Sequence, residues 1–443
     1  MKIRFVTLGC KLNFAESSAI GKALLQRGHT RAKQGEEADI CVINTCSVTD
    51  NADHKDRQTI HRIHRQNPNA IIIVTGCYAQ LQPEQIAQIE GVDYVLGQNE
   101  KYEITQLVDK IERLRDSLED ASLQDAASGY SLEAQKIRVA NIREVEEFHG
   151  ACSKDDRTRC FLKVQDGCNY FCTYCTIPYA RGKSRNPAIS DIIKDAQEAI
   201  SQGAKEIILT GVNIGDFGRS TGESFLELLR ALDGLEAKGE RQEAKGEDYR
   251  IRISSCEPNL LTDEIIDFVA QSKHFAPHFH IPLQSGSNEV LSIMKRRYTR
   301  ELFEERVQHI KQVMPHAFIG VDCMVGVRGE TEECFNDYID FIKRLDVSQL
   351  HVFTYSERAN TRMLELDVCI VPKAERQRRS KILHEISEEK TRTFYANQTG
   401  REAIVLWESK KEGDQMAGFT ENYVKVYRPY DKAKVNTFEV IRL

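Results

Sequence analysis

The sequence predicts an α/β protein with an N-terminal doubly wound parallel sheet, a central partial (β/α) barrel and a small C-terminal β-barrel. Short apolar runs alternate with segments of helical spacing over residues 1–96 and again from residue 160, which is typical of parallel β-α units. After Gly400 the pattern changes to short strands of alternating polarity, as in a small antiparallel barrel. The length of 443 residues is consistent with about three domains.

The order of the elements follows from these patterns. The first segment predicts strands at 3–8, 39–44 and 70–75, with helices over 16–27, over 53–66 and after Pro83. The second predicts six strands, at 161–165, 206–211, 250–255, 278–283, 318–324 and 350–355. A charged helix is expected at 376–396, followed by strands at 402–407, 423–427 and 437–443. The predicted parts are therefore an N-terminal domain (1–125), a linker (126–153), a barrel (154–375) and a C-terminal module (376–443).

Composition excludes several classes of protein. No apolar run approaches the ~18–20 residues of a membrane span, and the N-terminus lacks the features of a signal peptide. Thirteen cysteines, an odd number, argue against a disulfide framework and for metal or redox chemistry in a reducing compartment, so we expect a cytoplasmic protein. The net charge of −6 excludes a uniformly basic nucleic-acid coat. The repeated EAKGE at 236–240 and 243–247 predicts only a solvated loop.

Three cysteines form a C-x3-C-x2-C motif directly after the first strand of the second β-α series. Thiolates bind iron–sulfur clusters, and Cys168, Cys172 and Cys175 on one tight loop can hold three irons of a 4Fe–4S cube. The fourth iron is then open to another ligand. The alternatives are a zinc loop or unrelated buried thiols, but zinc normally takes four protein ligands from two separated pairs.

A second set of three cysteines is dispersed in sequence but shares one structural position. Cys10, Cys46 and Cys77 each follow a predicted strand of the N-terminal sheet, so they are expected at its carboxyl edge. They too can hold a cluster with one open iron; the alternative is three ordinary buried thiols. Cys41 lies inside a strand and is interpreted as core. The remaining cysteines are interpreted as core or incidental: Cys152, Cys160, Cys256, Cys323, Cys334 and Cys369.

The C-x3-C-x-aromatic-C motif after the first barrel strand resembles that of the radical S-adenosylmethionine superfamily. The resemblance implies that the open iron binds the amino and carboxylate groups of S-adenosylmethionine and that Tyr174 lies against its adenine. It also implies that a set of residues at the strand ends binds the cofactor: Thr210, Gly211, Asn213, Ser255, Glu257, Gln284 and Ser285. For each of them, a role in a turn or a helix cap is the alternative.

Longer stretches extend the resemblance over nearly the whole chain. TLGCKLNFAES, NTCSVT, TGCYAQ, IPLQSGS and MKRRYTR resemble the methylthiotransferases, and the C-terminal module resembles the RNA-binding TRAM module. One departure is Val327–Arg328, where the family usually has an aromatic–proline pair. The resemblance implies two 4Fe–4S clusters and two molecules of S-adenosylmethionine. The barrel cluster would cleave one molecule to a radical, and the auxiliary cluster would present sulfur that the other methylates.

The resemblance leaves three substrates open. Lys11 in TLGCKLN and the segment 53–68 favour N6-threonylcarbamoyladenosine next to the anticodon (position 37 of tRNA), methylthiolated at carbon 2. Isopentenyladenosine in tRNA and an aspartate of a ribosomal protein are the alternatives. The implied partners are tRNA and an electron donor such as a flavodoxin or ferredoxin. A hypothesis of a different class is a non-catalytic iron–sulfur protein that binds RNA. The intact C-x3-C-x2-C motif disfavours this hypothesis.

Two basic regions are candidates for contact with RNA. Residues 376–443 carry 14 Lys and Arg against 10 Asp and Glu, so the C-terminal barrel is the first candidate. Its expected contacts are Lys410, Lys411, Lys425 and Arg428, with stacking by Tyr423 or Trp407, although Trp407 fits a core position better. The helix at 53–66, with Lys55, Arg57, Arg62, Arg65 and three histidines, is the second; a solvated polar face is its alternative.

Overall fold

The computed structural model describes residues 1–33, 35–120, 136–153, 158–235 and 249–443. The EAKGE repeat and residues 126–135 of the expected linker lie outside these ranges. The chain forms two compact units. Unit 1 comprises Met1–Glu147 and Thr176–Lys183, and unit 2 comprises Phe148–Cys175 and Ser184–Leu443. Within the described residues, no helix is both long and apolar enough to cross a membrane.

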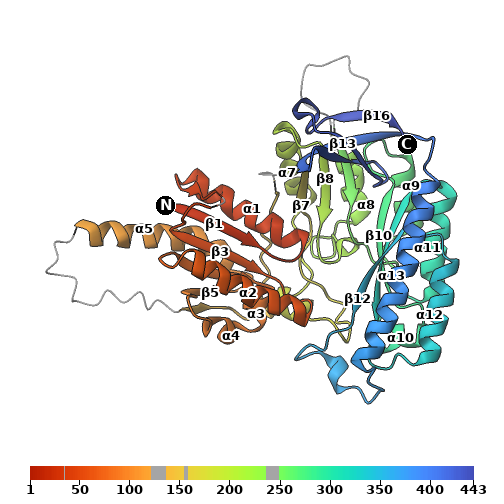
Figure 1. The fold of residues 1–443 in the computed structure, drawn as a ribbon, viewed down its shortest axis with the longest axis horizontal. Coiled ribbons are helices and arrows are strands. Elements are labelled where there is room, and N and C mark those ends of the chain that lie inside the picture. Colours follow the sequence, from red (N-terminus) through yellow and green to blue (C-terminus); the bar gives the residue numbers. More distant parts are fainter. Residues whose placement is uncertain (34, 121–135, 154–157, 236–248) are drawn as a thin grey trace. The chain divides into compact units, whose positions relative to one another are not determined.

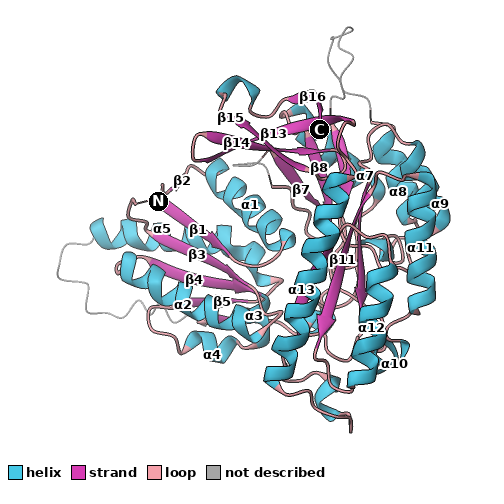
Figure 2. Cartoon of the chain, turned by 45° about the vertical axis from the view of Figure 1, so that its right-hand side comes forward, coloured by secondary structure: helices cyan, strands magenta, loops and turns pink. Residues whose placement is uncertain are grey.

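Figure 2 shows β2, β1, β3, β4 and β5 of unit 1. With β6 they form a six-stranded parallel sheet in the order β2-β1-β3-β4-β5-β6. This confirms the predicted doubly wound sheet, with the order reversing between β1 and β3. Short strands at the edges had no clear sequence pattern. The strands are β1 (Lys2–Thr7), β2 (Thr30–Arg31), β3 (Ile40–Thr45), β4 (Ile71–Gly76), β5 (Tyr94–Leu96) and β6 (Ile137–Arg138).

Helices cover both faces of this sheet, which is why its central strands are apolar throughout. In β3, Ile40 and Val42 pack with α1 and α5 on one face, whereas Cys41 and Ile43 pack with α2, α3 and α4 on the other. Cys41 is fully buried, as predicted. The helices are α1 (Lys11–Gln26), α2 (Asp50–Gln66), α3 (Cys77–Leu81), α4 (Pro83–Ala87), α5 (Ile104–Asp120) and α6 (Ile177–Arg181).

Unit 2 contains six parallel strands in two three-stranded sheets, β7-β8-β9 and β10-β11-β12. Parallel bridges from Ile251 to Phe275 and from Ser255 to His280 join the sheets, so the predicted partial barrel is confirmed. The strands are β7 (Arg159–Lys163), β8 (Glu206–Thr210), β9 (Arg250–Ile253), β10 (His278–Gln284), β11 (Phe318–Val325) and β12 (Gln349–Thr354).

Amphipathic helices pack on these strands around one large core. The last of them, α13, runs along the edge strand β12 (Figure 1), where Leu383 and Ile386 enter the core. The helices are α7 (Ile189–Ser201), α8 (Phe225–Asp233), α9 (Asp263–Gln271), α10 (Asn288–Ile293), α11 (Arg300–Val313), α12 (Glu332–Arg344) and α13 (Lys373–Ala396). Short 3₁₀ helices of unit 2 occupy Ile214–Asp216, Arg362–Glu365 and Lys432–Lys434, and those of unit 1 occupy Glu100–Glu103 and Ile142–Glu144.

The C-terminal segment forms a four-stranded antiparallel sheet in the order β15-β14-β13-β16, as expected of an antiparallel module. The strands are β13 (Glu402–Glu412), β14 (Gln415–Thr420), β15 (Lys425–Pro429) and β16 (Phe438–Arg442). Buried arginines of β9 attach this sheet to the barrel. Arg250 donates to the carbonyls of Ile404 and Phe419, at 3.2 and 3.0 Å. The module therefore packs on the barrel as part of unit 2.

The carboxylate of the fully buried Glu206 neutralises the positive charge of these arginines. Its carboxylate pairs with Arg250 and, at 3.0 Å, with Arg252. Burial alone would raise the pKa of Glu206, but the charges of the two guanidinium groups hold it below its usual range. The stabilisation from the ionised form is therefore complete above the ordinary carboxyl pKa and is lost as the pH falls below it.

Glu206→Gln is expected to lower the free energy of unfolding by about 3–5 kcal/mol, because two buried cations lose their counter-charge. Urea titration at neutral pH measures the effect. Glu385→Gln is the matched control, since Glu385 pairs with Lys381 on an exposed face of α13 and should cost less than about 1 kcal/mol. A similar loss in both variants would contradict a structural role for the buried pair.

The structure corrects one interpretation of the cysteines. Cys152 and Cys160, expected to be core or incidental, form a disulfide with their Cα atoms 6.3 Å apart. An antiparallel bridge between Cys152 and Leu162 folds this segment back against β7 and brings the two thiols together. Of the other cysteines in that group, Cys256, Cys323 and Cys334 are buried and Cys369 is exposed.

Candidate metal centres

Three thiols of unit 1 follow strands that end level with one another. Thr7 of β1 pairs with Asn44 of β3, and Asn44 pairs with Thr75 of β4. Cys10, Cys46 and Cys77 come two or three residues after these positions. They therefore lie at the carboxyl edge of the sheet, and the first two flank the point where the strand order reverses, the usual ligand-binding position of such sheets.

Glycines let the chain close around these thiols. Gly9 has φ +92°, and a Cβ there would lie 2.6 Å from the Cβ and 2.9 Å from the Sγ of Cys46. The peptide before Cys10 thus passes directly against Cys46. Gly76 has φ +102°, and a Cβ there would lie 2.3 Å from the carbonyl oxygen of Thr45. Any side chain at either position would push the thiol-bearing segments apart.

Burial makes Cys46 and Cys77 weak acids in the absence of metal. Burial, together with the neighbouring thiolates of Cys77 and Cys10, raises the pKa of Cys46 to about 12. Burial also raises the pKa of Cys77, on which Cys10 acts in the same direction. Binding of iron would release their protons, so assembly of a cluster is coupled to pH.

Behind the thiols lies a buried network of charges that the sequence did not reveal. Glu16 is ion-paired with Lys101 at 2.6 Å and with Arg181 at 3.0 Å. Each of these side chains is at most 1% exposed. Arg181 also donates to Asn13 at 2.7 Å, and the Gln98 amide donates to the Cys77 sulfur at 3.2 Å. The charges of Arg181 and Lys101 favour the Cys77 thiolate against the effect of burial.

In unit 2, the C-x3-C-x2-C motif forms a tight loop after β7. The backbone N–H of Tyr170 donates to the Cys168 sulfur at 3.5 Å, and the N–H of Cys175 donates to the carbonyl of Cys172 at 3.0 Å. Phe171 adopts φ +51°, a conformation that costs energy in a residue with a side chain. Burial raises the pKa of Cys168 to about 12. N–H···S hydrogen bonds of this kind tune the potential of an iron–sulfur cluster.

Arg296 organises the surroundings of this loop and was not among the predicted site residues. Its guanidinium donates to the Cys172 sulfur at 3.1 Å, lies 3.4 Å from the Tyr174 hydroxyl and is ion-paired with Glu257. Two predicted residues, Tyr174 and Glu257, therefore meet beside Cys172. Arg296 belongs to the segment MKRRYTR, which contributes to the family resemblance as a whole. Nothing in the spacing of this segment indicates which of its arginines lies at the site.

Two predicted residues at strand ends have buried polar atoms that lack a well-formed hydrogen bond. The amide of Asn213, a residue 2% exposed, makes no hydrogen bond of good geometry among the described residues and has only the Tyr170 hydroxyl beside it. The side-chain oxygen of Gln284, a residue with φ +65°, is also unpaired. Gln165 holds the loop before Asn213 by accepting from the N–H groups of Val212 and Asn213, at 2.9 and 2.8 Å. A polar ligand would satisfy these atoms.

Other predicted residues already have partners within the protein. Thr210 donates to the carbonyl of Ile208 at 3.1 Å, and Ser285 accepts from the N–H of Ser287 at 3.2 Å. Ser255 is hydrogen-bonded to His280 at 2.9 Å. Gly211 allows close packing, since a Cβ there would lie 2.7 Å from Ile214. Their roles in binding the cofactor remain predictions.

The donor sets suit clusters by their chemistry and their spacing. Within the described ranges, no group of three or more His, Cys, Asp or Glu side chains is placed to hold a single metal ion. A single ion draws all its ligands onto one atom, whereas each cysteine of a 4Fe–4S cluster binds a different iron. The thiols of unit 2, two of which accept hydrogen bonds from N–H donors at their sulfurs, are therefore chemically suited to the larger group.

Comparison with known proteins identifies the family. Residues 2–97 match the family described as "Uncharacterized protein family UPF0004", and residues 162–342 match the "Radical SAM superfamily". A threonylcarbamoyladenosine tRNA methylthiotransferase (MtaB) of Bacillus subtilis is 37% identical over 430 residues, covering 96% of this chain and 89% of the relative. The chain belongs to the radical S-adenosylmethionine methylthiotransferase family. Membership implies S-adenosylmethionine and a 4Fe–4S cluster as cofactors.

A second relative supports this assignment, and one solved structure resembles the chain in fold. A tRNA-2-methylthio-N(6)-dimethylallyladenosine synthase of Pelotomaculum thermopropionicum is 31% identical and covers 94% of this chain and 88% of the relative. The radical S-adenosylmethionine methyltransferase TsrM of Kitasatospora setae has a similar fold, with a TM-score of 0.55 and 15% identity. That likeness covers 80% of this chain and 72% of the other.

The structure explains the departure of this methylthiotransferase from the family pattern at Val327–Arg328. Val327 is fully buried in an apolar cluster with Met294 and Tyr355. Arg328 turns outward and pairs with Glu357 at 2.8 Å. The apolar side chain thus fills the space beneath the loop, and the ion pair fixes the loop at the surface. Neither residue is a cluster ligand.

The C-terminal aromatics have structural roles in this family member. Trp407 is 3% exposed and donates to Glu439, which fits the core position that its strand predicted. Tyr423 packs against the rings of His278 and Phe318 and is bonded through its hydroxyl to Arg159. The ring and hydroxyl of Tyr423 thus attach the module to the barrel, and stacking of Tyr423 on a base stays a prediction.

Proposed function

We propose that this enzyme methylthiolates carbon 2 of N6-threonylcarbamoyladenosine at position 37 of tRNA. The observation that carries the proposal is the presence of two separate three-cysteine sites, one in each unit. Cys168, Cys172 and Cys175 would hold the cluster that binds S-adenosylmethionine. Cys10, Cys46 and Cys77 would hold a second 4Fe–4S cluster. The two donor sets support two different tasks, since a single radical site needs only one of them.

The residues around each site support a division of labour. When bound, the clusters and S-adenosylmethionine would supply the electron, the radical that removes hydrogen from carbon 2, and the methylated sulfur that replaces it. Arg296 would orient Tyr174 and Glu257 beside the cofactor, and Asn213 and Gln284 would hydrogen-bond its polar groups. Gln98 would hydrogen-bond the auxiliary site through Cys77. An external donor of the flavodoxin or ferredoxin type would supply electrons, and tRNA as substrate supports a cytoplasmic location.

The relatives are named for two different modified adenosines, and the choice of substrate rests on how similar this chain is to each group. The relative named for threonylcarbamoyladenosine is 37% identical to this chain, against 31% for the one named for dimethylallyladenosine. Lys11 and the basic segment 53–68 favour the same branch. Isopentenyl-type adenosine remains the alternative substrate. A non-catalytic RNA-binding role is the alternative of another class, and it requires that the protein fail to cleave S-adenosylmethionine.

Tandem mass spectrometry of tRNA nucleosides tests the proposal. A strain lacking the gene should accumulate N6-threonylcarbamoyladenosine and lose its 2-methylthio derivative completely, and a plasmid copy of the gene should restore it. The level of 2-methylthio-isopentenyladenosine in the same digest is the internal control and should not change. Loss of that nucleoside instead would move the enzyme to the alternative branch.

A further inference from the structure

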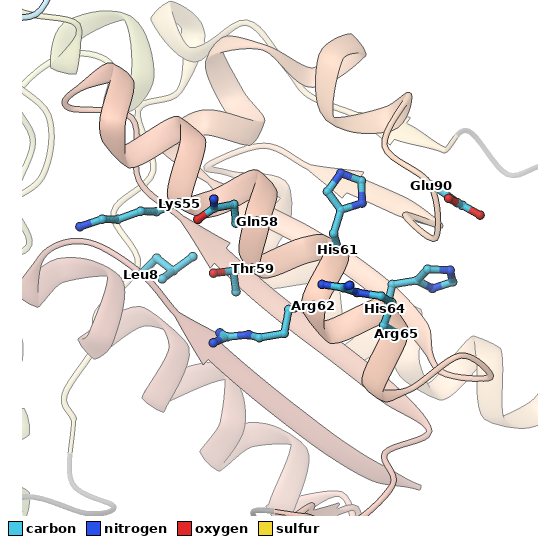
Figure 3. Close-up of a pocket in the computed structure, with 9 residues that line it drawn as sticks. All are labelled: Leu8, Lys55, Gln58, Thr59, His61, Arg62, His64, Arg65 and Glu90. Atoms are coloured by element: carbon cyan, nitrogen blue, oxygen red, sulfur yellow. The ribbon is translucent and has the colours of Figure 1, made fainter.

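A basic pocket beside α2 in unit 1 lies outside both cysteine sites. It has a volume of about 770 Å³. Figure 3 shows Lys55 and Arg62 on the side of α2 where Leu8 lies, and His61 on the side of Glu90. The lining residues are Leu8, Lys55, Gln58, Thr59, His61, Arg62, His64, Arg65 and Glu90. All but Leu8 and Glu90 come from α2, so one helix supplies nearly the whole surface.

The distribution of charge along α2 leaves three of its cations, Lys55, Arg62 and Arg65, without acidic partners among the described residues, whereas Arg57 donates to the Tyr78 hydroxyl. Thr49 caps the helix, and the acids Asp50, Asp53 and Asp56 occupy its first two turns. Asp53 and Asp56 are buried, where they accept hydrogen bonds from the Ser47 hydroxyl and the Cys46 N–H, both at 2.8 Å. Residues 57–66 then contain no carboxylate. In the described part of the chain, no acidic group forms an ion pair with Lys55, Arg62 or Arg65.

These cations form one continuous stripe. Lys55, Gln58, Arg62 and Arg65 are exposed and follow one another at intervals of three or four residues, which places them along one side of a helix. From Lys55 to Arg65 the stripe extends about 15 Å along the helix axis. That length exceeds what one phosphate can contact, so the stripe matches a chain of phosphates. Thr59 and Leu8 offer a neutral floor between the cations.

A solvated polar face and a favourable interaction with the helix dipole are the ordinary explanations of such a stripe. Solvated faces usually mix both signs and pair them, and the C-terminal module does so. There Lys425 pairs with Glu412, and both Arg428 and Lys434 pair with Glu439. Unpaired cations concentrated on α2, in a chain with a net charge of −6, distinguish this surface from the first-choice candidate for RNA contact.

We propose that the α2 stripe, defined as Lys55, Gln58, Arg62 and Arg65, binds the sugar–phosphate backbone of the tRNA substrate. This inference rests on the proposed function. Guanidinium and ammonium groups bind phosphates and position the nucleic acid, with little discrimination between bases. In the C-terminal module, Lys425, Arg428 and Lys434 are held by carboxylates and contribute less to the affinity.

The test compares full-length protein with the variant Lys55→Gln/Arg62→Gln/Arg65→Gln. Bulk tRNA from the strain lacking the gene is the probe, titrated at several salt concentrations. Each lost phosphate contact should reduce the slope of log K against log [salt] by about 0.7–0.9, so the triple variant should lose about 2–3 and bind about tenfold or more weakly at 0.1 M salt. Iron content and cleavage of S-adenosylmethionine without tRNA should not change, because the stripe contains no cysteine.

The matched control removes three exposed charges from α13, by Lys373→Gln, Lys381→Gln and Arg392→Gln. It should retain the affinity and salt slope of the wild type. The inference would be overturned if the α2 variant bound tRNA as the wild type does, or if the control lost as much affinity as the α2 variant. Neither result would contradict the proposed enzymatic function. If millimolar inorganic phosphate displaces tRNA more strongly than its ionic strength alone would, the pocket is a site for a single phosphate. That result would also overturn the inference. Wild-type protein that binds no tRNA would instead refute the proposed function.

Discussion

Replacing Cys168, Cys172 and Cys175 together with alanine should abolish cleavage of S-adenosylmethionine. The loop after β7 would keep its shape through the backbone contacts of Tyr170 and Cys175, but it would have no ligand for iron. Anaerobically reconstituted protein should then fall from about eight irons to about four. Iron analysis and chromatographic assay of 5′-deoxyadenosine measure both effects, and no residual cleavage above the background is expected.

A buried cysteine elsewhere in the barrel controls for the loss of a thiol. Cys323 is fully buried in β11 and belongs to the hydrophobic core. Cys323→Ala should cost about 1 kcal/mol of stability through the small cavity it leaves, with iron content and cleavage unchanged. Cleavage that persists in the triple variant would show that the radical chemistry uses another site.

Changing Cys10, Cys46 or Cys77 to alanine should produce the opposite separation of activities. Each variant should keep one cluster and still form 5′-deoxyadenosine, because the loop of unit 2 is intact. None should transfer a methylthio group to tRNA. The nucleoside product, the iron content and the yield of 5′-deoxyadenosine, measured on the same preparation, give the complete pattern.

Cys41→Ala is the control in the same sheet. Cys41 lies one residue into β3, is fully buried, and burial raises its pKa to about 11. Its removal should cost about 1 kcal/mol and leave both clusters in place. If Cys41→Ala loses a cluster and Cys46→Ala retains it, the auxiliary site lies inside the sheet and the assignment of the strand-end cysteines is wrong.

The sequence predicted those parts of the fold that depend on local pattern. Apolar runs located β1, β3 and β4 within one or two residues, and the same strand ends then placed Cys10, Cys46 and Cys77 on one edge. Helix α1 begins at Lys11 rather than at residue 16, because its first turn carries polar residues such as Asn13 that are buried by contacts to other segments. Strand β14 was missed, because its small residues Ala417 and Gly418 carry no strand signal and allow close packing against Trp407.

The polar surroundings of the candidate sites could not be predicted in the same way. Lysine and arginine are normally exposed, so nothing in the sequence indicated that Lys101 and Arg181 are buried around Glu16. These side chains are 85 and 165 residues away from Glu16 in sequence, and only the packed structure brings them together. The disulfide between Cys152 and Cys160 was also not predicted. An odd number of cysteines in a reducing compartment argues against a framework of disulfides, but it does not say whether two particular thiols come together in the fold.

The pairing of Arg181 with Glu16 limits how this protein can be divided. Residues 176–183 belong to unit 1, although in sequence they begin directly after Cys175 of unit 2. A fragment that ends at Glu147 therefore omits one of its own buried cations and leaves Asn13 without the guanidinium that it accepts from. Gly182, with φ +77°, also packs against the carbonyl of Ile142, so the same fragment would uncover that backbone. The N-terminal sheet is thus not a self-contained module that could be expressed alone or exchanged between enzymes without the eight residues that the barrel segment supplies.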